Sequence, residues 1–327
     1  MSLLIKKKAE VHLHIDGSLE IMELYKMLEK SKKYGNIEEL YEKVSVTGKE
    51  SSLTEYLTKF DIPLMCMQNM ENIRTVVGSL CKKLENEEYI YSELRFAPHL
   101  NNGVSREEAV EAVLEGIKNE SSKNRVGVIL CIMRHLDEKS GFEIVELAEK
   151  YGRDGVVGID IAGDERYGVE KFEKVLKKAK ERGIKVTVHA GEAAGAESVK
   201  KAVEYGADRI GHGIRAIEDL ELCKELCKRE IMLEICPKSN LDTRVYSNFK
   251  KDYPVRKLYE MGVKIGLNSD NRTVSNSNLE NESRILIENF GFNELEVKEL
   301  IRNNIKYGFC NEELKKRLLE EFDKKNV

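Results

Sequence analysis

Eight short apolar runs, separated by amphipathic segments, constrain the fold of this chain more than any other feature. The runs are rich in β-branched residues and cover 9–15, 90–97, 126–133, 156–161, 185–189, 209–212, 232–236 and 263–267. The segments at 107–119, 142–151, 169–182, 198–205 and 220–229 have apolar residues at three- and four-residue spacing, with Lys and Glu elsewhere. That spacing is typical of a helix that covers a sheet. Strands that alternate with helices predict a parallel sheet.

Eight strand–helix units in 327 residues predict an α/β fold, a (β/α)8 TIM barrel, with residues 1–327 forming one domain. A doubly wound open sheet is the alternative, because the number of strands does not prove closure. The long insertion at 17–89 contains helical stretches at 21–30 and 52–60 and is predicted to be a lid over the carboxyl-terminal rim. Two extra helices are expected at 278–290 and 293–307, followed by a highly charged tail.

Charge and cysteine content exclude several classes of protein. The chain has 54 Lys and Arg against 58 Asp and Glu, a net charge of −4, so neither nucleic acid nor an anionic membrane is expected as a partner. No apolar run approaches the roughly 18 residues of a membrane span. The seven cysteines include no Cys-x-x-Cys, which argues against a disulfide framework or a thiolate zinc site. We therefore expect a cytoplasmic protein, a monomer or a weak homo-oligomer.

Three imidazoles and one carboxylate stand at the ends of predicted strands. His12 and His14 lie two apart in the first strand, so their side chains point to the same face. His189 ends the fifth strand and Asp270 follows the eighth. A barrel gathers the carboxyl ends of its strands at one rim, and such a donor set suits a catalytic divalent metal with a place left for water. Taken singly, each residue also fits a structural histidine or a turn aspartate.

Two further ionisable residues are expected at the same rim. Glu192 lies three residues after His189, and His212 ends the sixth strand. Glu192 could be another ligand, a helix N-terminal acid or a general acid or base, and His212 could be a second base. Without the metal cluster, both fit ordinary polar loop residues.

A competing motif favours a different class of enzyme. The sequence Gly211-x-Gly213-x-x-Ala216 follows a strand-like run and matches a dinucleotide-binding fingerprint, and Glu234 falls near the position expected for the ribose-binding acid. This reading predicts an NAD-dependent oxidoreductase. Against it, the fingerprint usually opens its own domain, and a bulky histidine stands where the backbone must approach a pyrophosphate.

Seven segments in order along the chain resemble the motifs of adenosine deaminases, in the metal-dependent amidohydrolase group. They are EVHLHIDGS (10–18), SELRFAPHL (92–100), IMRH (132–135), VGIDIAGDE (157–165), VHAGE (188–192), RIGHG (209–213) and NSD (268–270). The resemblance implies hydrolytic deamination of adenosine and 2′-deoxyadenosine in purine salvage, with a purine nucleoside as the small-molecule partner.

The resemblance also implies roles for individual residues. One Zn²⁺ per chain would be held by His12, His14, His189 and Asp270. Glu192 would protonate N1 of the purine, while His212 and Asp270 would orient the attacking water and act as base. The substrate-binding residues would be His14, Asp16 and Gly17 near the ribose, Gly163 at N3, and the gate-helix segment 53–60 with Leu53, Tyr56, Leu57 and Phe60.

One position departs from the family pattern and leaves the substrate open. Better-known members have a second aspartate, which binds N7, where this chain has Asn271. An amide can donate to N7 without a raised pKa, so we expect the role to survive. Adenine or a modified adenine nucleoside such as aminodeoxyfutalosine is the close alternative. More distant alternatives are ester or amide hydrolysis with the same metal and a non-catalytic binding protein.

Overall fold

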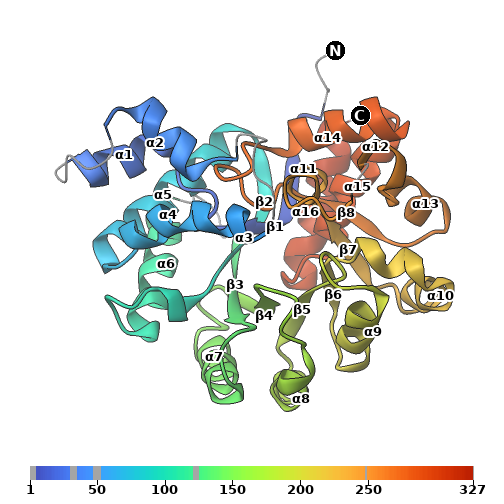
Figure 1. Ribbon diagram of the computed structural model, residues 1–327, viewed down its shortest axis with the longest axis horizontal. Coiled ribbons are helices and arrows are strands. Elements are labelled where there is room, and N and C mark those ends of the chain that lie inside the picture. The colour runs from blue at the N-terminus through green and yellow to red at the C-terminus, as the bar shows by residue number, and fades with distance from the viewer. Residues whose placement is uncertain (1–4, 30–34, 47–52, 121–124, 247–248, 327) are drawn as a thin grey trace.

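The eight strands are consecutive neighbours in one parallel sheet that curves into a barrel with helices outside (Figure 1). The computed structural model describes residues 5–29, 35–46, 53–120, 125–246 and 249–326. The strand order β1-β2-β3-β4-β5-β6-β7-β8 confirms the predicted barrel, because a doubly wound sheet reverses its order at a switch point. The strands are β1 Lys8–His14, β2 Tyr89–Phe96, β3 Val126–Met133, β4 Val156–Ala162, β5 Lys185–Ala190, β6 Arg209–His212, β7 Met232–Ile235 and β8 Ile265–Leu267.

Along the chain, most helices connect one strand to the next. Several of them have a side-chain cap at the N-terminus. Asn69, Asp137 and Asp219 each accept a backbone N–H in the first turn of the helix that they precede. The α-helices are α1 Ile21–Glu29, α2 Ile37–Val44, α3 Leu53–Leu57, α4 Asp61–Cys66, α5 Met70–Asn86, α6 Arg106–Glu120, α7 Glu138–Lys150, α8 Glu173–Glu181, α9 Ala196–Glu204, α10 Leu220–Arg229, α11 Pro237–Asp242, α12 Phe249–Asp252, α13 Val255–Glu260, α14 Leu279–Phe290, α15 Glu294–Lys306 and α16 Glu312–Lys325. Short 3₁₀ segments are η1 Thr58–Phe60, η2 Pro98–Leu100, η3 Glu170–Phe172 and η4 Ile214–Glu218.

The highly charged segment expected after residue 307 forms helix α16, a helix that the sequence analysis did not predict. Asn311 caps the helix, and Leu318 and Phe322 are its buried side chains. These two residues are four apart and therefore share one face, while charged side chains cover the others. The narrow apolar stripe explains why the composition indicated only a charged tail.

The segment 17–89 divides into two structural parts. Helix α5 packs against α6 and β2, in the position of the helix that joins the first two strands of a barrel. Helices α1 to α4 precede α5 in the chain and lie near one another, in the blue part of the ribbon in Figure 1. Among the described residues of segment 17–89, helices α3, η1 and α4 line the cavity at the rim.

The barrel closes between β1 and β8 largely through side-chain amides. The two strands share a single backbone bridge, between Leu13 and Asp270. Below this bridge, Asn268 Oδ1 accepts the backbone N–H of Val11 at 2.8 Å. Asn304 of α15 donates to the carbonyls of Ala9 and Leu267, on opposite sides of the seam, at 2.8 and 2.7 Å. These amides satisfy polar groups that a regular ladder would have paired.

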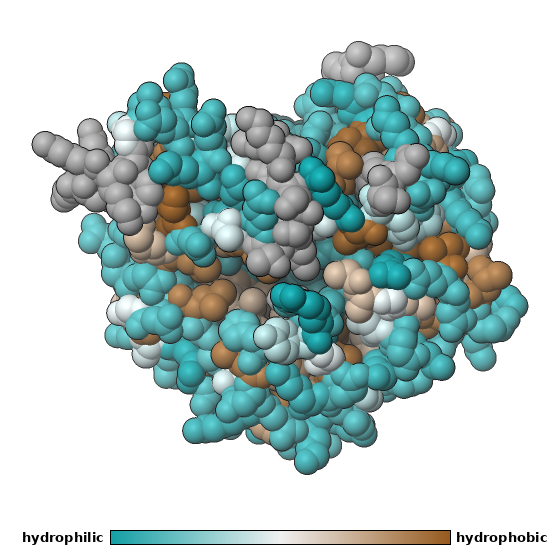
Figure 2. All heavy atoms as spheres, viewed as in Figure 1, coloured by the Kyte–Doolittle hydropathy of each residue, from teal (hydrophilic) through white to brown (hydrophobic). Residues whose placement is uncertain are grey.

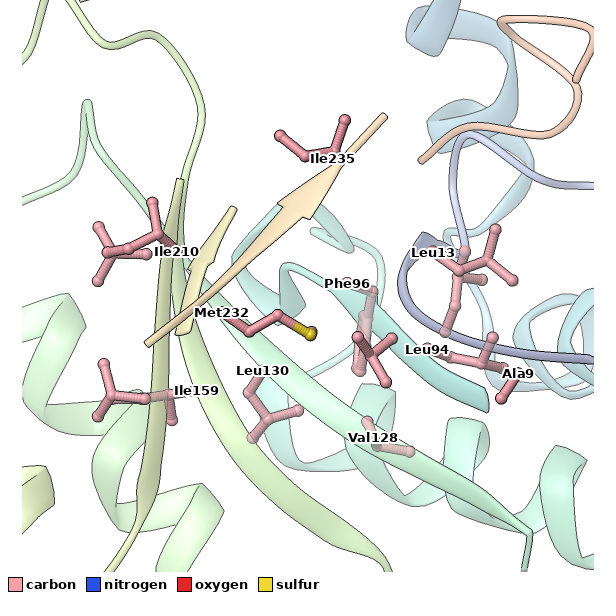
Figure 3. Close-up of a cluster of buried hydrophobic side chains, with 14 of the residues drawn as sticks. Ala9, Leu13, Leu94, Phe96, Val128, Leu130, Ile159, Ile210, Met232 and Ile235 are labelled. Carbon is pink, nitrogen blue, oxygen red and sulfur yellow. The ribbon is translucent and has the colours of Figure 1, made fainter. Parts of the chain in front are cut away.

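The barrel interior is charged, whereas the layer between strands and helices is apolar. Glu93, Arg95, Asp160, Arg209 and Glu234 are all buried and alternate along their strands with apolar neighbours. Figure 3 shows part of the apolar cluster, with labelled side chains from β1, β2, β3, β4, β6 and β7. Barrel interiors are more often filled with branched apolar residues. The ion pairs here lie directly beneath the rim that carries the predicted site.

The outer surface is mostly hydrophilic on the face seen in Figure 2, where hydrophobic residues form small, separate groups. Within the described ranges, none of the helices is long and apolar enough to cross a membrane.

Candidate active site

Four residues predicted as metal ligands converge at the carboxyl-terminal rim. The ligand atoms of His12, His14, His189 and Asp270 lie within 4.8 Å of one another. Asp270 Oδ1 is 3.4 Å from the Nε2 atoms of both His12 and His14. The Nε2 atoms of His14 and His189 are 3.2 Å apart. Nitrogens of three rings therefore surround one point together with a carboxylate oxygen.

Buried carboxylates hold two of these imidazoles by their other nitrogen. His12 Nδ1 lies 2.7 Å from Glu234 Oε2, and His189 Nδ1 lies 2.9 Å from Asp160 Oδ2. A carboxylate is an acceptor, so each ring carries its hydrogen on Nδ1 and turns the lone pair of Nε2 toward the cluster. Sequence reasoning missed both carboxylates. The available signal was a charged residue in the middle of an otherwise apolar strand.

The donor set fits a divalent metal ion. His12 Nε2 is buried and has no hydrogen-bond partner, which is costly unless an ion uses its lone pair. Burial, the nearby His189 and His12 rings and Arg95 hold the pKa of His14 well below its usual range, which keeps that ligand neutral. Burial alone would raise the pKa of Asp270, but the nearby imidazoles of His12, His14 and His212 lower it well below its usual range. Neutral imidazoles and an ionised carboxylate are the forms that bind zinc.

A second grouping, His212, Cys236 and Asp270, shares the same carboxylate but is a poorer metal site. Burial raises the pKa of Cys236 well above its usual range, and its Sγ donates to the Glu234 carbonyl at 3.6 Å. Because a metal binds the thiolate rather than the thiol, this environment disfavours coordination.

The backbone is strained at two of the predicted catalytic residues. His212 and Asp270 have φ values of 61° and 60°, in the left-handed region that residues other than glycine rarely adopt. Such a conformation costs about 1–3 kcal/mol and persists only where surrounding contacts enforce it. The strain turns both side chains toward the cavity, and His212 Nε2 lies 4.0 Å from Asp270 Oδ2.

Glu192 faces the cluster from the loop after β5. Its Oε1 accepts hydrogen bonds from Asn240 Nδ2 at 2.9 Å and from Thr243 Oγ1 at 3.1 Å, and its Oε2 lies 3.7 Å from His212 Nε2. Glu165, another residue that sequence reasoning missed, fixes the loop by accepting the backbone N–H groups of Glu192 and Ala194. The loop conformation therefore depends on a side chain from the neighbouring β4 loop.

A cavity of about 210 Å³ lies above the cluster. Among the described residues, the ionisable side chains that line it are acidic residues and histidines, and no Lys or Arg lines it. Tyr56, Leu57 and Phe60 of the predicted gate helix line it, whereas the side chain of Leu53 lies outside the described part of the chain. The acidic residues are Asp16, Asp61, Asp164, Glu165, Glu192 and Asp270.

The other predicted substrate-binding residues lie along the same cavity, except Gly17, which is not among its lining residues. Asp16, Gly163 and Asn271 line it, and burial raises the pKa of Asp16 to about 6. Gly17 is required by packing, since an added Cβ would stand 1.8 Å from Asn271 Oδ1. Asn271 Nδ2 donates to the Tyr56 hydroxyl at 2.9 Å, which connects the gate helix to the rim.

The dinucleotide-binding interpretation is wrong for a structural reason. Glu234, the candidate ribose-binding acid, is completely buried inside the barrel. Its Oε2 contacts His12 and Arg95, and its Oε1 contacts Arg209 and Thr187. No oxygen is left for a ribose. Gly213 begins η4 rather than a long helix, so the N-terminus that would bind a pyrophosphate is also missing at this turn.

Three imidazoles and a carboxylate at the carboxyl-terminal rim of a (β/α)8 barrel define a metal-dependent hydrolase. The sequence profile of the adenosine deaminase family matches residues 7–325. The chain therefore belongs to the adenosine deaminase family, whose members are metal-dependent hydrolases that act on a purine amino group.

Individual relatives agree with this placement. An adenosine deaminase from Clostridium acetobutylicum is 38% identical over 325 residues, with 97% of each chain covered. An arabidopsis N6-mAMP deaminase is similar in structure, with 26% identity, a TM-score of 0.87 and coverage of 98% of this chain and 99% of that one. An adenine deaminase from Arthrobacter aurescens shares the fold, with 24% identity, a TM-score of 0.86 and 98% coverage of both chains.

Proposed function

We propose that this chain hydrolyses the 6-amino group of adenosine and 2′-deoxyadenosine, giving inosine or deoxyinosine and ammonia, as a cytoplasmic step in purine salvage. The observation that carries the proposal is the position of Glu192 on the cavity lined by His14, His189 and Asp270, three of the four predicted metal ligands. A purine placed there would have the electrophilic carbon facing the cluster and a ring nitrogen facing an acid. The C. acetobutylicum relative supports adenosine as the substrate.

His12, His14, His189 and Asp270 would hold one Zn²⁺ per chain. When bound, the ion would act as a Lewis acid that makes hydroxide available at neutral pH. The rest of the proposed chemistry is carried by side chains of this protein.

Two groups of residues would handle protons on either side of the purine ring. Glu192 would deliver a proton from Oε2 to N1, so that the ring accepts the electron pair displaced from the C6–N1 bond. On the other side, Asp270 and His212 would orient the attacking water, with Asp270 as the acceptor of its proton. Asp270 would then pass its proton to the amino group, so that the C6–N bond breaks and ammonia leaves. The C6 hydroxyl would lose its remaining hydrogen and restore the Glu192 acid, which leaves a 6-oxopurine. General acid catalysis of this kind contributes about 10²–10⁴ in rate.

The remaining cavity residues would bind and orient the nucleoside. Gly163 would donate its backbone N–H to N3, and Asp16, with His14 and Gly17, would bind the ribose. N7 only accepts hydrogen bonds, so Asn271 would turn its NH₂ group toward the base. Its oxygen could then accept from the Tyr56 hydroxyl.

An apolar gate would cover the bound base. Leu53, Tyr56, Leu57 and Phe60 would form it, and Tyr56 and Phe60 make an edge-to-face contact with ring centroids 5.9 Å apart. Excluding water from the cavity would strengthen the polar contacts inside it.

The charge of the cavity favours a neutral nucleoside over a nucleotide. Asp61, Asp164 and Glu165 line it together with the residues assigned above, and no Lys or Arg of the described chain does so. Although Arg166 pairs with Asp164, a phosphate monoester would meet a lining whose charged groups are mainly carboxylates, which opposes binding. The arabidopsis relative is named for a nucleotide substrate, so the acidic lining predicts a difference in specificity between the two proteins.

The experiment compares adenosine, 2′-deoxyadenosine, adenine and AMP in parallel, with purified zinc-loaded protein, ultraviolet absorbance and an ammonia assay. We expect turnover of the two nucleosides with release of one ammonia per nucleoside. Turnover of adenine alone would replace the proposal with the free-base alternative. Turnover of none of the four would contradict it, and a modified adenine nucleoside would be tested next.

A further inference from the structure

Asn240 is a buried amide between the two residues assigned to proton handling and water orientation. It lies in α11, directly after β7, and its exposed fraction is zero. Its Nδ2 is 2.9 Å from Glu192 Oε1 and 3.1 Å from His212 Nδ1. Its Oδ1 accepts the hydroxyl of Tyr253 at 3.0 Å. One side-chain amide therefore contacts both residues.

The partners determine the orientation of this amide. The Glu192 carboxylate oxygen accepts, so it must face the NH₂ group, and the Tyr253 hydroxyl then donates to the amide oxygen. The two hydrogens of Nδ2 are both used, one for Glu192 and one for His212. Since Nδ2 only donates, His212 Nδ1 must present a lone pair, and the neutral imidazole carries its hydrogen on Nε2.

We infer that Asn240 is a positioning residue that orients Glu192 and sets the tautomer of His212. With Oε1 of Glu192 occupied by Asn240 and Thr243, Oε2 is the oxygen left to carry a proton to the substrate. With Nδ1 of His212 occupied by Asn240, Nε2–H faces the cavity as a donor. His212 would then orient the attacking water by donating a hydrogen bond, and Asp270 would accept the proton. This inference rests on the proposed function.

Thr243 provides a matched comparison within the same site. Its hydroxyl shares one hydrogen between the same Glu192 oxygen at 3.1 Å and the carbonyl of Ser239 at 3.0 Å, and no contact with His212 accompanies it among the described residues. The variant Thr243→Val removes one contact to Glu192 and leaves His212 unchanged. The variant Asn240→Asp keeps the shape of the side chain but replaces the shared donor with an acceptor, so it disrupts both contacts.

The kinetic test uses the zinc-loaded full-length chain with adenosine. We expect Asn240→Asp to lower kcat by at least about 100-fold, with a KM change below about threefold, because general acid catalysis and orientation are lost while the base and ribose contacts remain. Thr243→Val should lower kcat by only about 10-fold, because it removes one neutral hydrogen bond. Metal content and the affinity for inosine should stay near wild type in both variants. Asn240→Ser, which restores a donor, should recover part of the loss and also covers the case in which Asn240→Asp does not fold.

A spectroscopic test is independent of turnover. The chain has only six histidines, so selective ¹⁵N labelling gives a small set of ring nitrogen signals. We expect one ring to be an Nε2–H tautomer in the wild-type holoenzyme, and its signals to change in Asn240→Ser but not in Thr243→Val. Asn240 variants that keep kcat within threefold and leave all ring signals unchanged would overturn the inference while the proposed function stands. A wild-type enzyme inactive on all four substrates would overturn both.

Discussion

The buried carboxylate of Glu234 is expected to set the metal affinity of the site as well as the stability of the barrel. It accepts hydrogen bonds from His12 Nδ1 at 2.7 Å, Arg95 Nη2 at 2.9 Å, Arg209 Nε at 2.7 Å and Thr187 Oγ1 at 3.0 Å. Burial alone would raise the pKa of Glu234, but the two guanidinium groups hold it well below its usual range. It is therefore an ionised acceptor at every working pH.

The variant Glu234→Gln keeps the volume and removes the charge. It leaves two buried arginines with one fewer counterion, and breaking a buried pair in this way costs about 3–5 kcal/mol in free energy of unfolding. It also weakens the acceptor that orients His12, and loss of such a partner typically lowers metal affinity about 10–100-fold. We expect both effects, measured by urea denaturation of the metal-free protein and by competition with a zinc chelator.

Glu93 offers a control that separates the two effects. It is equally buried and pairs with the same Arg209, Oε2 to Nη2, at 2.6 Å, but its other contacts are with Tyr91 and the backbone of Phe309. Glu93→Gln should therefore lose a similar amount of stability, about 3–5 kcal/mol, with a change in zinc affinity below about threefold. Equal losses of zinc affinity in the two variants would refute the reasoning, because affinity would then follow stability alone.

Three further outcomes follow from single contacts. Glu192→Gln should retain one zinc per chain but lower kcat by about 10²–10⁴-fold. The control Glu197→Gln, on the exposed face of α9, should keep wild-type kcat. Near-normal turnover by Glu192→Gln would contradict the assigned role. Burial raises the pKa of Glu282 to about 8, so between pH 5 and 8 the folded protein holds a proton that the unfolded chain releases. Between pH 6 and 8, above the raised pKa of Asp16, stability should then fall with rising pH by about 1.4 kcal/mol per unit, and Glu282→Gln should remove that slope in denaturation curves measured across this range. Asn304→Leu leaves the carbonyls of Ala9 and Leu267 unpaired at the seam and should lower the free energy of unfolding, measured by urea denaturation, by about 3 kcal/mol. An unchanged urea midpoint would show that water replaces the amide.

The sequence was sufficient for the barrel and for the proposed ligands, because both depend on local periodicity. His12 and His14 share a face through the two-residue repeat of a strand, and strand ends meet at one rim. Asp160, Glu234 and Asn240 were not found, because their contacts join strands that are far apart along the chain. Glu234 was considered only as the ribose-binding acid of the competing dinucleotide motif, since a carboxylate in a strand has the same one-dimensional pattern whether it faces a ligand or a buried arginine.

Helices were missed where apolar residues are sparse. Helix α16 shows this most clearly, since only Leu318 and Phe322 among its side chains are buried. The position of a residue in three dimensions decides such cases, and a single sequence without relatives does not supply it.

The side-chain amides that bind the edge of β1 are synthesised late, so the barrel can close only at a late stage of translation. Asn268, Asn304 and Asn326 come from the last fifth of the chain, and Asn326 pairs with the backbone of Lys6 and Lys7. A nascent chain exposes its N-terminal strand first, and domains begin to fold in that direction. Here the edge of β1 remains unpaired until α15 and α16 have been synthesised. All four proposed zinc ligands, in contrast, have been synthesised by residue 270. Ribosome-bound chains should therefore acquire the metal site only after Asn304 has emerged, and chains stalled before residue 304 would present an open barrel edge to chaperones and proteases.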